Sequence, residues 1–135
     1  MKTIKFVTVH QALMLHEKIV VTENGISGVR DTNLLESALA QPQMMLFGEY
    51  VYKDVFEMGS AYFFHIVKNH PFFDGNKRAG LLIALTFFRK NGMRIRADHD
   101  ELYLLAIHTA SSQIGKEEIA HFFKKTATFA KKPKK

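Results

Sequence analysis

The residues whose types and spacing best suit catalysis lie in one short stretch, from His70 to Arg78. It reads His-Pro-Phe-Phe-Asp-Gly-Asn-Lys-Arg and leads directly into an apolar segment typical of a buried helix. A histidine, a carboxylate and two cations thus stand close together in the sequence. Transfer of a phosphate-containing group needs a proton acceptor, a metal ligand and positive charge around the phosphates, so this combination suits such a reaction.

Lys77 and Arg78 fall in the first turn of the expected helix. A helix N-terminus carries a partial positive charge, so each cation there costs about 0.3–1 kcal/mol. We therefore expect a bound anion to offset them. Gly75 lets the backbone approach a ligand closely, and the unpaired N–H groups of a first helical turn point outward. These features predict a phosphate-binding site formed by Gly75, Lys77 and Arg78 at the start of the helix.

The neighbouring side chains predict the other parts of a transfer site. Asp74 is a hard oxygen ligand suited to Mg²⁺ on a polyphosphate. His70 can accept a proton from an attacking hydroxyl near neutral pH. Pro71 is expected to stiffen the loop, and either Phe72 or Phe73 to anchor it in the core. On residue types alone, an ordinary turn followed by a helix cap remains an alternative.

The periodicity of the whole chain predicts an all-α fold of about six helices packed around a central one. That central helix is expected at residues 79–88, which are apolar on every face. Capping residues or turns mark the starts of other helices at Thr8, Asp54, Asp98 and Gly115. For the second helix, Asp31, Thr32 and Asn33 are alternative caps. Residues 43–53 and 93–96 are candidates for short strands.

Length and charge predict one domain with a basic end. The chain has 135 residues and a net charge of +6. Residues 124–135 contain six lysines and no acid, which leaves residues 1–123 with 13 basic and 13 acidic residues. We expect a single domain over residues 1–123 and a solvated, disordered tail over 124–135. Nucleic-acid contact is expected only through this tail.

Composition also excludes several classes of protein. The chain has no cysteine, which excludes a disulfide scaffold, a thiolate zinc site and a cysteine nucleophile, and suits the reducing cytoplasm. The apolar stretch at residues 79–88 has about half of the roughly 20 residues that a membrane span needs, so no membrane is expected. The six histidines other than His70 show no metal-binding spacing and are expected at helix surfaces or the core edge.

The stretch from His70 to Arg78 resembles the signature of the Fic/Doc family, His-x-Phe-x-Asp/Glu-Gly-Asn-Gly/Lys-Arg. The upstream sequence Gly-Val-Arg-Asp at residues 28–31, Leu-Leu-Glu-Ser-Ala-Leu at residues 34–39 and Pro42 is similar to the Doc (death-on-curing) branch. One departure is Ala79, where that branch commonly has threonine. The resemblance implies a compact helical fold that binds ATP and Mg²⁺ at the motif.

The resemblance also implies roles for single residues. His70 would be the base, and Asp74 would be the metal ligand. The phosphates would be held by Gly75, Asn76 and Arg78. Residues 43–53 correspond to the family's flap, a hairpin that positions a segment of the target protein by strand-like pairing. Exposed side chains of Tyr50, Val51 and Tyr52 would suit that role. A loop that packs its own apolar groups is the alternative.

Lys77 bears on the reaction, because most of the family has glycine there and transfers AMP. Doc-type toxins share the lysine, and the resemblance then implies transfer of the γ-phosphate of ATP to a threonine of elongation factor Tu. AMP transfer through the same residues is one alternative. An inactive module that binds an antitoxin or nucleic acid is another.

Regulation is expected to come from a second protein. Many family members carry an inhibitory Ser/Thr-x-x-x-Glu-Gly/Asn helix, and the nearest match here, from Thr32 to Ser37, ends in serine. We interpret its Glu36 as part of a helix surface. The resemblance therefore implies a Phd-like antitoxin that acts in trans, whose disordered segment folds against this protein.

Overall fold

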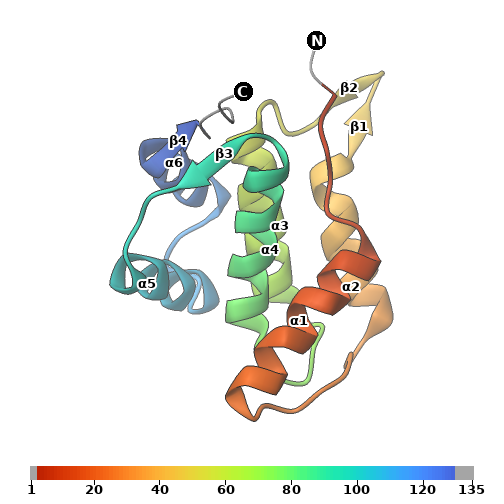
Figure 1. Ribbon diagram of the computed structural model, residues 1–135. Coiled ribbons are helices and arrows are strands. Elements are labelled where there is room, and N and C mark those ends of the chain that lie inside the picture. The colour runs from red at the N-terminus through yellow and green to blue at the C-terminus, as the bar shows by residue number, and fades with distance from the viewer. Residues whose placement is uncertain (1–2, 130–135) are drawn as a thin grey trace, which may run out of the picture.

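A computed structural model describes residues 3–129, which form six α-helices and two small two-stranded sheets (Figure 1). The elements are α1 (Val9–Glu23), α2 (Thr32–Ala40), the 3-10 turn η1 (Gln41–Gln43), β1 (Met45–Leu46), β2 (Glu49–Tyr50), α3 (Val55–Asn69), α4 (Asn76–Lys90), β3 (Met93–Ile95), α5 (His99–Ala110), α6 (Lys116–Thr126) and β4 (Ala127–Phe129). The mainly helical fold that the sequence predicts is confirmed.

Local sequence determines where most helices begin. In four helices the N-cap side chain accepts the backbone N–H of the third helical residue, an interaction that contributes about 1 kcal/mol. These N-caps are Thr8, Asp31, Asp54 and Asp98. The N-termini of these four helices therefore follow from local hydrogen bonds whose residue types the sequence already shows.

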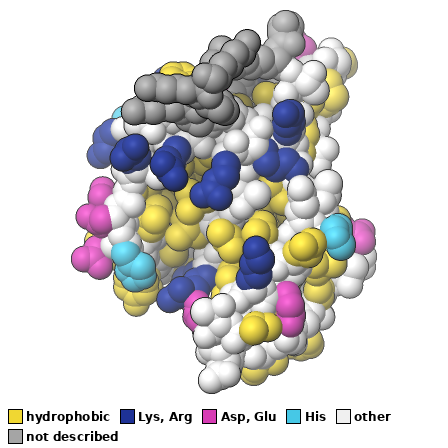
Figure 2. Space-filling model, in the orientation of Figure 1, with side chains coloured by type: hydrophobic (Ala, Val, Ile, Leu, Met, Phe, Trp, Pro, Cys, Tyr) yellow, Lys and Arg dark blue, Asp and Glu magenta, His cyan; other side chains and the backbone are white. Residues whose placement is uncertain are grey.

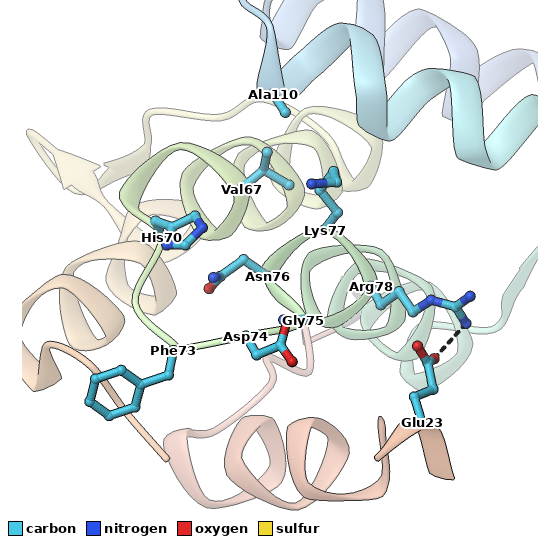
Figure 3. Close-up of a pocket in the computed structure, with 10 residues that line it drawn as sticks. All are labelled: Glu23, Val67, His70, Phe73, Asp74, Gly75, Asn76, Lys77, Arg78 and Ala110. Atoms are coloured by element: carbon cyan, nitrogen blue, oxygen red, sulfur yellow. Dashed lines mark hydrogen bonds and ion pairs between the residues drawn. The ribbon is translucent and has the colours of Figure 1, made fainter. Parts of the chain in front are cut away.

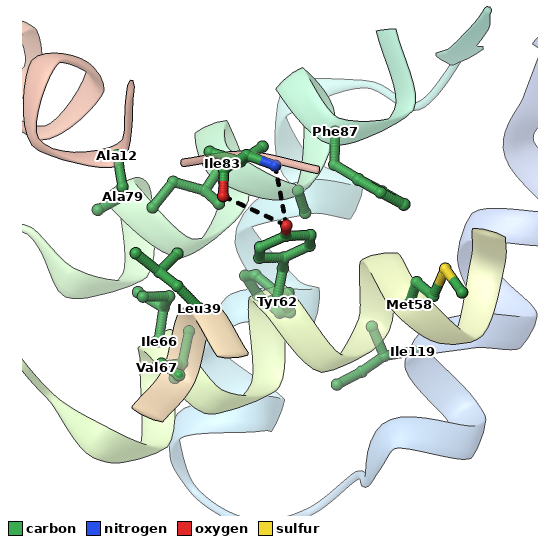
Figure 4. Packing of buried hydrophobic residues seen from close by; sticks show 14 of the residues in the cluster. Ala12, Leu39, Met58, Tyr62, Ile66, Val67, Ala79, Ile83, Phe87 and Ile119 are labelled. Atoms are coloured by element: carbon green, nitrogen blue, oxygen red, sulfur yellow. Dashed lines mark hydrogen bonds between the residues drawn. The ribbon is translucent and has the colours of Figure 1, made fainter. Parts of the chain in front are cut away.

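The centre of the core is shared by α3 and α4 rather than formed by α4 alone. Helix α3 packs against α2, α4, α5 and α6. It buries a nearly continuous run of side chains that includes Tyr62 and Ile66 (Figure 4). Helix α4 contributes the fully buried Ile83 and Phe87, but its Leu81 is only half-buried. The reason is that Leu81 opens onto a cavity between α4 and α5.

The N-terminal segment is attached to this core by one buried hydroxyl group. The Tyr62 hydroxyl accepts the Val7 N–H at 2.9 Å and donates to the Val7 carbonyl at 3.4 Å (Figure 4). Burial raises the pKa of the Tyr62 hydroxyl, so the group stays protonated and can make both bonds.

Strands β1 and β2 form a short hairpin within residues 43–53, one of the two segments that are candidates for short strands from the sequence. Its two turn residues, Phe47 and Gly48, have φ values of +53° and +80°. Positive φ at both central positions is the mark of a type I′ hairpin turn, which suits the twist of the strands. The Phe47 side chain at the tip is 96% exposed.

The folded domain extends past the boundary that the sequence predicts at residues 123 and 124. Lys124 and Lys125 form the last turn of α6, where cations suit the partial negative charge of a helix C-terminus. The chain continues as β4, which pairs antiparallel with β3. The remainder of the predicted tail, residues 130–135, lies outside the described residues. No helix between residues 3 and 129 has the length and apolar character to cross a membrane.

Candidate functional site

The loop between α3 and α4 forms one wall of a cavity of about 280 Å³ (Figure 3). The cavity is lined by Glu23, Val67, His70, Phe73, Asp74, Gly75, Asn76, Lys77, Arg78 and Ala110. The structure therefore brings the histidine, the carboxylate and both cations of the sequence motif to one cavity.

His70 ends α3 in the left-handed conformation, with a φ of +53°. This backbone state costs on the order of 1 kcal/mol or more for a non-glycine residue and persists only where neighbouring groups fix it. Arg30 does so: its Nε donates to the His70 carbonyl at 2.8 Å and its guanidinium also donates to the Asn69 carbonyl at 3.1 Å. The loop is further held because the Pro71 carbonyl accepts the N–H groups of Arg30 and Asp31.

Phe72 anchors the loop in the core, whereas Phe73 is exposed. The Phe72 N–H donates to Asn76 Oδ1 at 2.9 Å, and Asn76 Nδ2 donates back to the Phe72 carbonyl at 3.0 Å. Pro71 is buried beside them. Both ends of the buried Asn76 side chain thus hold the loop in place.

His16 of α1 supports the loop from the opposite side, a role that sequence reasoning missed. Its ring is 3% exposed and stacks on Phe72 with centroids 3.7 Å apart. Its Nε2 lies 2.8 Å from the Asp74 carbonyl oxygen. The available signal was the position of a histidine on the apolar stripe of the first helix, because a buried polar group needs a partner.

The Asp74 carboxylate is held at the exposed edge of the cavity by two backbone groups. Oδ2 accepts the Ile26 N–H at 3.1 Å, and Oδ1 accepts the Gly75 N–H at 2.9 Å. Each carboxylate oxygen keeps further acceptor capacity, so Asp74 can serve as a single metal ligand. The described residues contain no cluster of three or more side chains that could hold a metal without other ligands.

The start of α4 offers unpaired hydrogen-bond donors. Gly75 is the N-cap in the left-handed conformation, with a φ of +73°, and it has no side chain to cap the helix. The Ala79 N–H donates to the Gly75 carbonyl. Within residues 3–129, the backbone N–H groups of Asn76, Lys77 and Arg78 donate to no acceptor. These three donors, beside the cavity, can bind an anion.

The charge at the start of α4 is already offset in part. Arg78 forms an ion pair with Glu23 at 2.7 Å, drawn as a dashed line in Figure 3. Glu23 ends α1, where a negative charge is unfavourable, so each residue compensates the other. Lys77 extends towards Val67 and Ala110 in Figure 3 and has no carboxylate partner in the described part of the chain.

The flap residues expected at the site have a different arrangement. Tyr50 packs against Phe6, with ring centroids 5.7 Å apart. The Tyr52 hydroxyl donates to Gln41 Oε1 at 3.1 Å and accepts from Lys116 Nζ at 2.8 Å. Both tyrosines are thus half-buried anchors of the hairpin, and the expectation that they are exposed is wrong because aromatic side chains at its base pack inward. Val51 is exposed, but none of the three lines the cavity.

The large apolar side chains of the flap that are most exposed are instead near its tip, namely Met45, Leu46 and Phe47. Sequence reasoning did not single them out as target contacts. Gly48, which suits the positive φ of a two-residue hairpin turn, was the signal that could have placed them near the tip.

His65 is separate from the cavity and belongs to the network at the base of the flap. Its Nε2 lies 3.2 Å from Lys116 Nζ. Burial, and secondly the charge of Lys116, lowers the pKa of His65 to about 4. His65 is therefore neutral at physiological pH and accepts a hydrogen bond from Lys116.

Comparisons with known proteins agree with the motif. The Fic/DOC family profile matches residues 6–88. "Toxin Doc" of Mycolicibacterium smegmatis is 38% identical over 72 residues, which are 53% of this chain and 55% of that protein. "Protein kinase doc" of Escherichia phage P1 is 28% identical over 116 residues, which are 86% of this chain and 90% of that protein. The chain thus spans little more than half of the first relative. Because the family match covers most of the chain and the entire loop at the cavity, this protein belongs to the Fic/DOC family.

Proposed function

We propose that the protein is a toxin of a toxin–antitoxin pair that transfers the γ-phosphate of ATP to a hydroxyl group of a target protein. The observation that carries the proposal is the meeting of His70, Asp74 and the unpaired N–H groups of α4 at one cavity. These are a proton acceptor, a metal ligand and an anion-binding helix start, which are the three parts that phosphoryl transfer requires.

The start of α4 fits the phosphates of a nucleotide. Three N–H donors and the unpaired Lys77 converge where the helix dipole favours negative charge. Asp74 fits Mg²⁺ in the presence of those phosphates, because Mg²⁺ usually keeps several waters and takes only one or two carboxylates. The metal would neutralise charge on the transferred phosphate.

In the proposed reaction, His70 accepts the proton of the target hydroxyl as its oxygen attacks the γ-phosphorus. The new bond is between that oxygen and phosphorus, and the bond from phosphorus to the β–γ bridging oxygen breaks, so ADP leaves. The hydrogen bonds from Arg30 to the carbonyls of Asn69 and His70 fix the histidine at the cavity. Such a positioned base contributes about 10²–10⁴-fold to the rate.

Transfer of phosphate rather than AMP is supported by Lys77. In this family glycine at that position leaves room for a diphosphate, whereas the lysine side chain fills space and adds a cation. The relative from phage P1 carries the name "Protein kinase doc", which agrees with phosphate transfer. AMP transfer is the alternative outcome.

The target is proposed to be a translation factor, with a threonine of elongation factor Tu as the first candidate from the family resemblance. The apolar side chains of Met45, Leu46 and Phe47 are available to contact it, because they lie exposed at the flap tip. Modification of such a factor would arrest translation.

A Phd-like antitoxin is the proposed partner, in line with the name "Toxin Doc" of one relative. A second cavity of about 200 Å³ lies between α4 and α5 and is lined by Lys77, Arg78, Leu81, His99, Leu102, Tyr103 and Ala106. Its apolar walls and two cations would suit an amphipathic segment that carries an acidic side chain. Binding there would place that acid beside Arg78.

Growth arrest on induced expression tests the proposal in cells. His70→Ala should remove the arrest, whereas His121→Ala should retain it, because His121 is exposed on α6 and makes no contact with the cavity. A His70→Ala protein that arrests growth as strongly as the parent, at equal abundance, would refute an enzymatic mode of action.

A further inference from the structure

The basic residues of this chain are concentrated in two segments. Residues 89–97 and 119–135 contain ten of the 19 basic residues and none of the 13 acidic ones. The rest of the chain therefore has nine bases against 13 acids. The concentration of basic residues is not confined to the terminal lysines, because four of the ten bases precede β3 or lie on and beside it.

The fold brings these two segments together. Strand β3 pairs with β4 so that Arg94 faces Thr128, and the Arg96 N–H donates to the Thr126 carbonyl at 2.8 Å. Arg89 lies in the last turn of α4, directly before β3. Figure 2 shows a row of Lys and Arg side chains across the side of the molecule on which β3 and β4 lie in Figure 1.

The arginines of this sheet point outward. Arg94 and Arg96 are exposed, and they alternate with Met93 and Ile95, which pack against the core. Alternation along a strand therefore places both arginines on the solvent side. We define the basic face as Arg89, Arg94, Arg96, Lys124 and Lys125. Within the described residues, none of these five side chains forms an ion pair.

The chemistry of the basic face favours one kind of partner. It has no apolar anchor at its centre, since the residues beside the two arginines on the outer side are polar, and protein–protein interfaces usually need such an anchor. The exposed Phe129 follows Thr128 and so lies on the other side of the sheet. An aromatic platform for unpaired bases is thus missing from the outer side of β3 and β4.

We infer that the basic face binds the phosphate backbone of double-stranded nucleic acid without reading its sequence. Arginine forks bind phosphate oxygens with two hydrogen bonds, and nucleic-acid interfaces are more polar and more positive than protein interfaces. The acidic remainder of the chain would orient the protein so that this side meets the polyanion.

The experiment measures binding of the full chain to a labelled DNA duplex of random sequence by fluorescence anisotropy, over a series of salt concentrations. Arg94→Glu with Arg96→Glu should weaken binding at least tenfold and lower the salt slope by about 2, because two phosphate contacts are lost. The matched control is Lys18→Glu with Lys68→Glu, which makes the same change in net charge at exposed positions on α1 and at the C-terminal end of α3. It should leave the slope nearly unchanged.

Arg94→Gln with Arg96→Gln serves as a milder second variant, and thermal unfolding establishes that each protein is folded. Equal loss of binding in the face and control variants would overturn the inference, because net charge alone would then explain it. The inference would also be overturned if removal of residues 130–135 abolished duplex binding while the Arg94 and Arg96 substitutions left it unchanged. Tighter binding to single-stranded RNA, an acidic peptide or anionic phospholipid vesicles than to the duplex would likewise overturn it.

Discussion

His16 Nε2 lies 2.8 Å from the backbone carbonyl oxygen of Asp74, although 58 residues separate the two in the chain. A carbonyl oxygen can only accept, so Nε2 carries a proton and donates it. The same ring stacks on Phe72. One side chain of α1 thus supports both the anchor of the loop and the residue that is proposed to bind the metal.

Replacing His16 tests this support. His16→Phe keeps an aromatic ring on Phe72 but leaves the Asp74 carbonyl without its donor, which should cost about 1–3 kcal/mol of stability. We expect the Mg²⁺ concentration needed for half-maximal phosphate transfer to rise, because the Asp74 backbone is less well fixed. Enzyme assays across a Mg²⁺ titration, combined with urea unfolding, measure both effects.

His16→Gln retains an N–H donor and should recover part of the Mg²⁺ response. His10→Phe, at an exposed position of the same helix, is the control. If His16→Phe loses stability but needs no more Mg²⁺ than the parent, His16 is a packing residue without influence on the site.

The ion pair between Glu23 and Arg78 is expected to compete with the nucleotide for Arg78. Glu23→Gln should tighten ATP binding by up to about fivefold, since an exposed pair contributes at most about 1 kcal/mol. Isothermal titration calorimetry measures the change. Glu36→Gln is the matched control, because Glu36 is exposed and forms no ion pair within the described residues. Weaker ATP binding by Glu23→Gln would contradict this competition.

Lys116 is expected to position the flap through Tyr52. Lys116→Met removes the 2.8 Å bond to the Tyr52 hydroxyl and the charge above its ring. Because hydrogen bonds to charged groups contribute about 1.5–3 kcal/mol, the KM for the protein target should rise by roughly tenfold while the KM for ATP stays constant. Steady-state kinetics distinguish the two, with Lys125→Met on α6 as control. A parallel rise in both KM values would indicate general destabilisation.

Acid should destabilise the protein through His65. Its pKa is lowered from 6.5 to about 4 in the folded state, so between these values only the unfolded chain binds the extra proton. The free energy of unfolding should therefore fall as the pH is lowered through this window, and the contribution is complete above about pH 6.5. Urea unfolding from pH 7 to pH 4 should show a shallower decline for His65→Gln than for the control His121→Gln. Identical slopes would contradict this assignment.

The parts of the fold that depend on neighbouring residues could be predicted from the sequence. The capping box of Thr8 with Gln11 and the two cations at the start of α4 each involve residues close in the chain. Their hydrogen bonds and dipole interactions are determined locally. The same holds for the stretch from His70 to Arg78, of which seven residues line one cavity because a single loop carries them.

The contacts that support the site could not be predicted, because they join distant segments. Arg30 reaches the carbonyl of His70 across 40 residues, and Lys116 reaches Tyr52 across 64. A single sequence shows the residue types but not which elements pack together. Strand β4, which follows α6, could not be predicted for a similar reason, since it pairs with the distant β3.

The central claim is that the cavity beside His70 transfers the γ-phosphate of ATP to a protein. The most direct test incubates the protein and purified elongation factor Tu with ATP labelled in either the γ- or the α-phosphate, with His70→Ala as control. Only γ-labelled ATP should label the target, and His70→Ala should lower the rate by about 10²–10⁴-fold. Labelling from α-labelled ATP would contradict the central claim and assign AMP transfer to the same site.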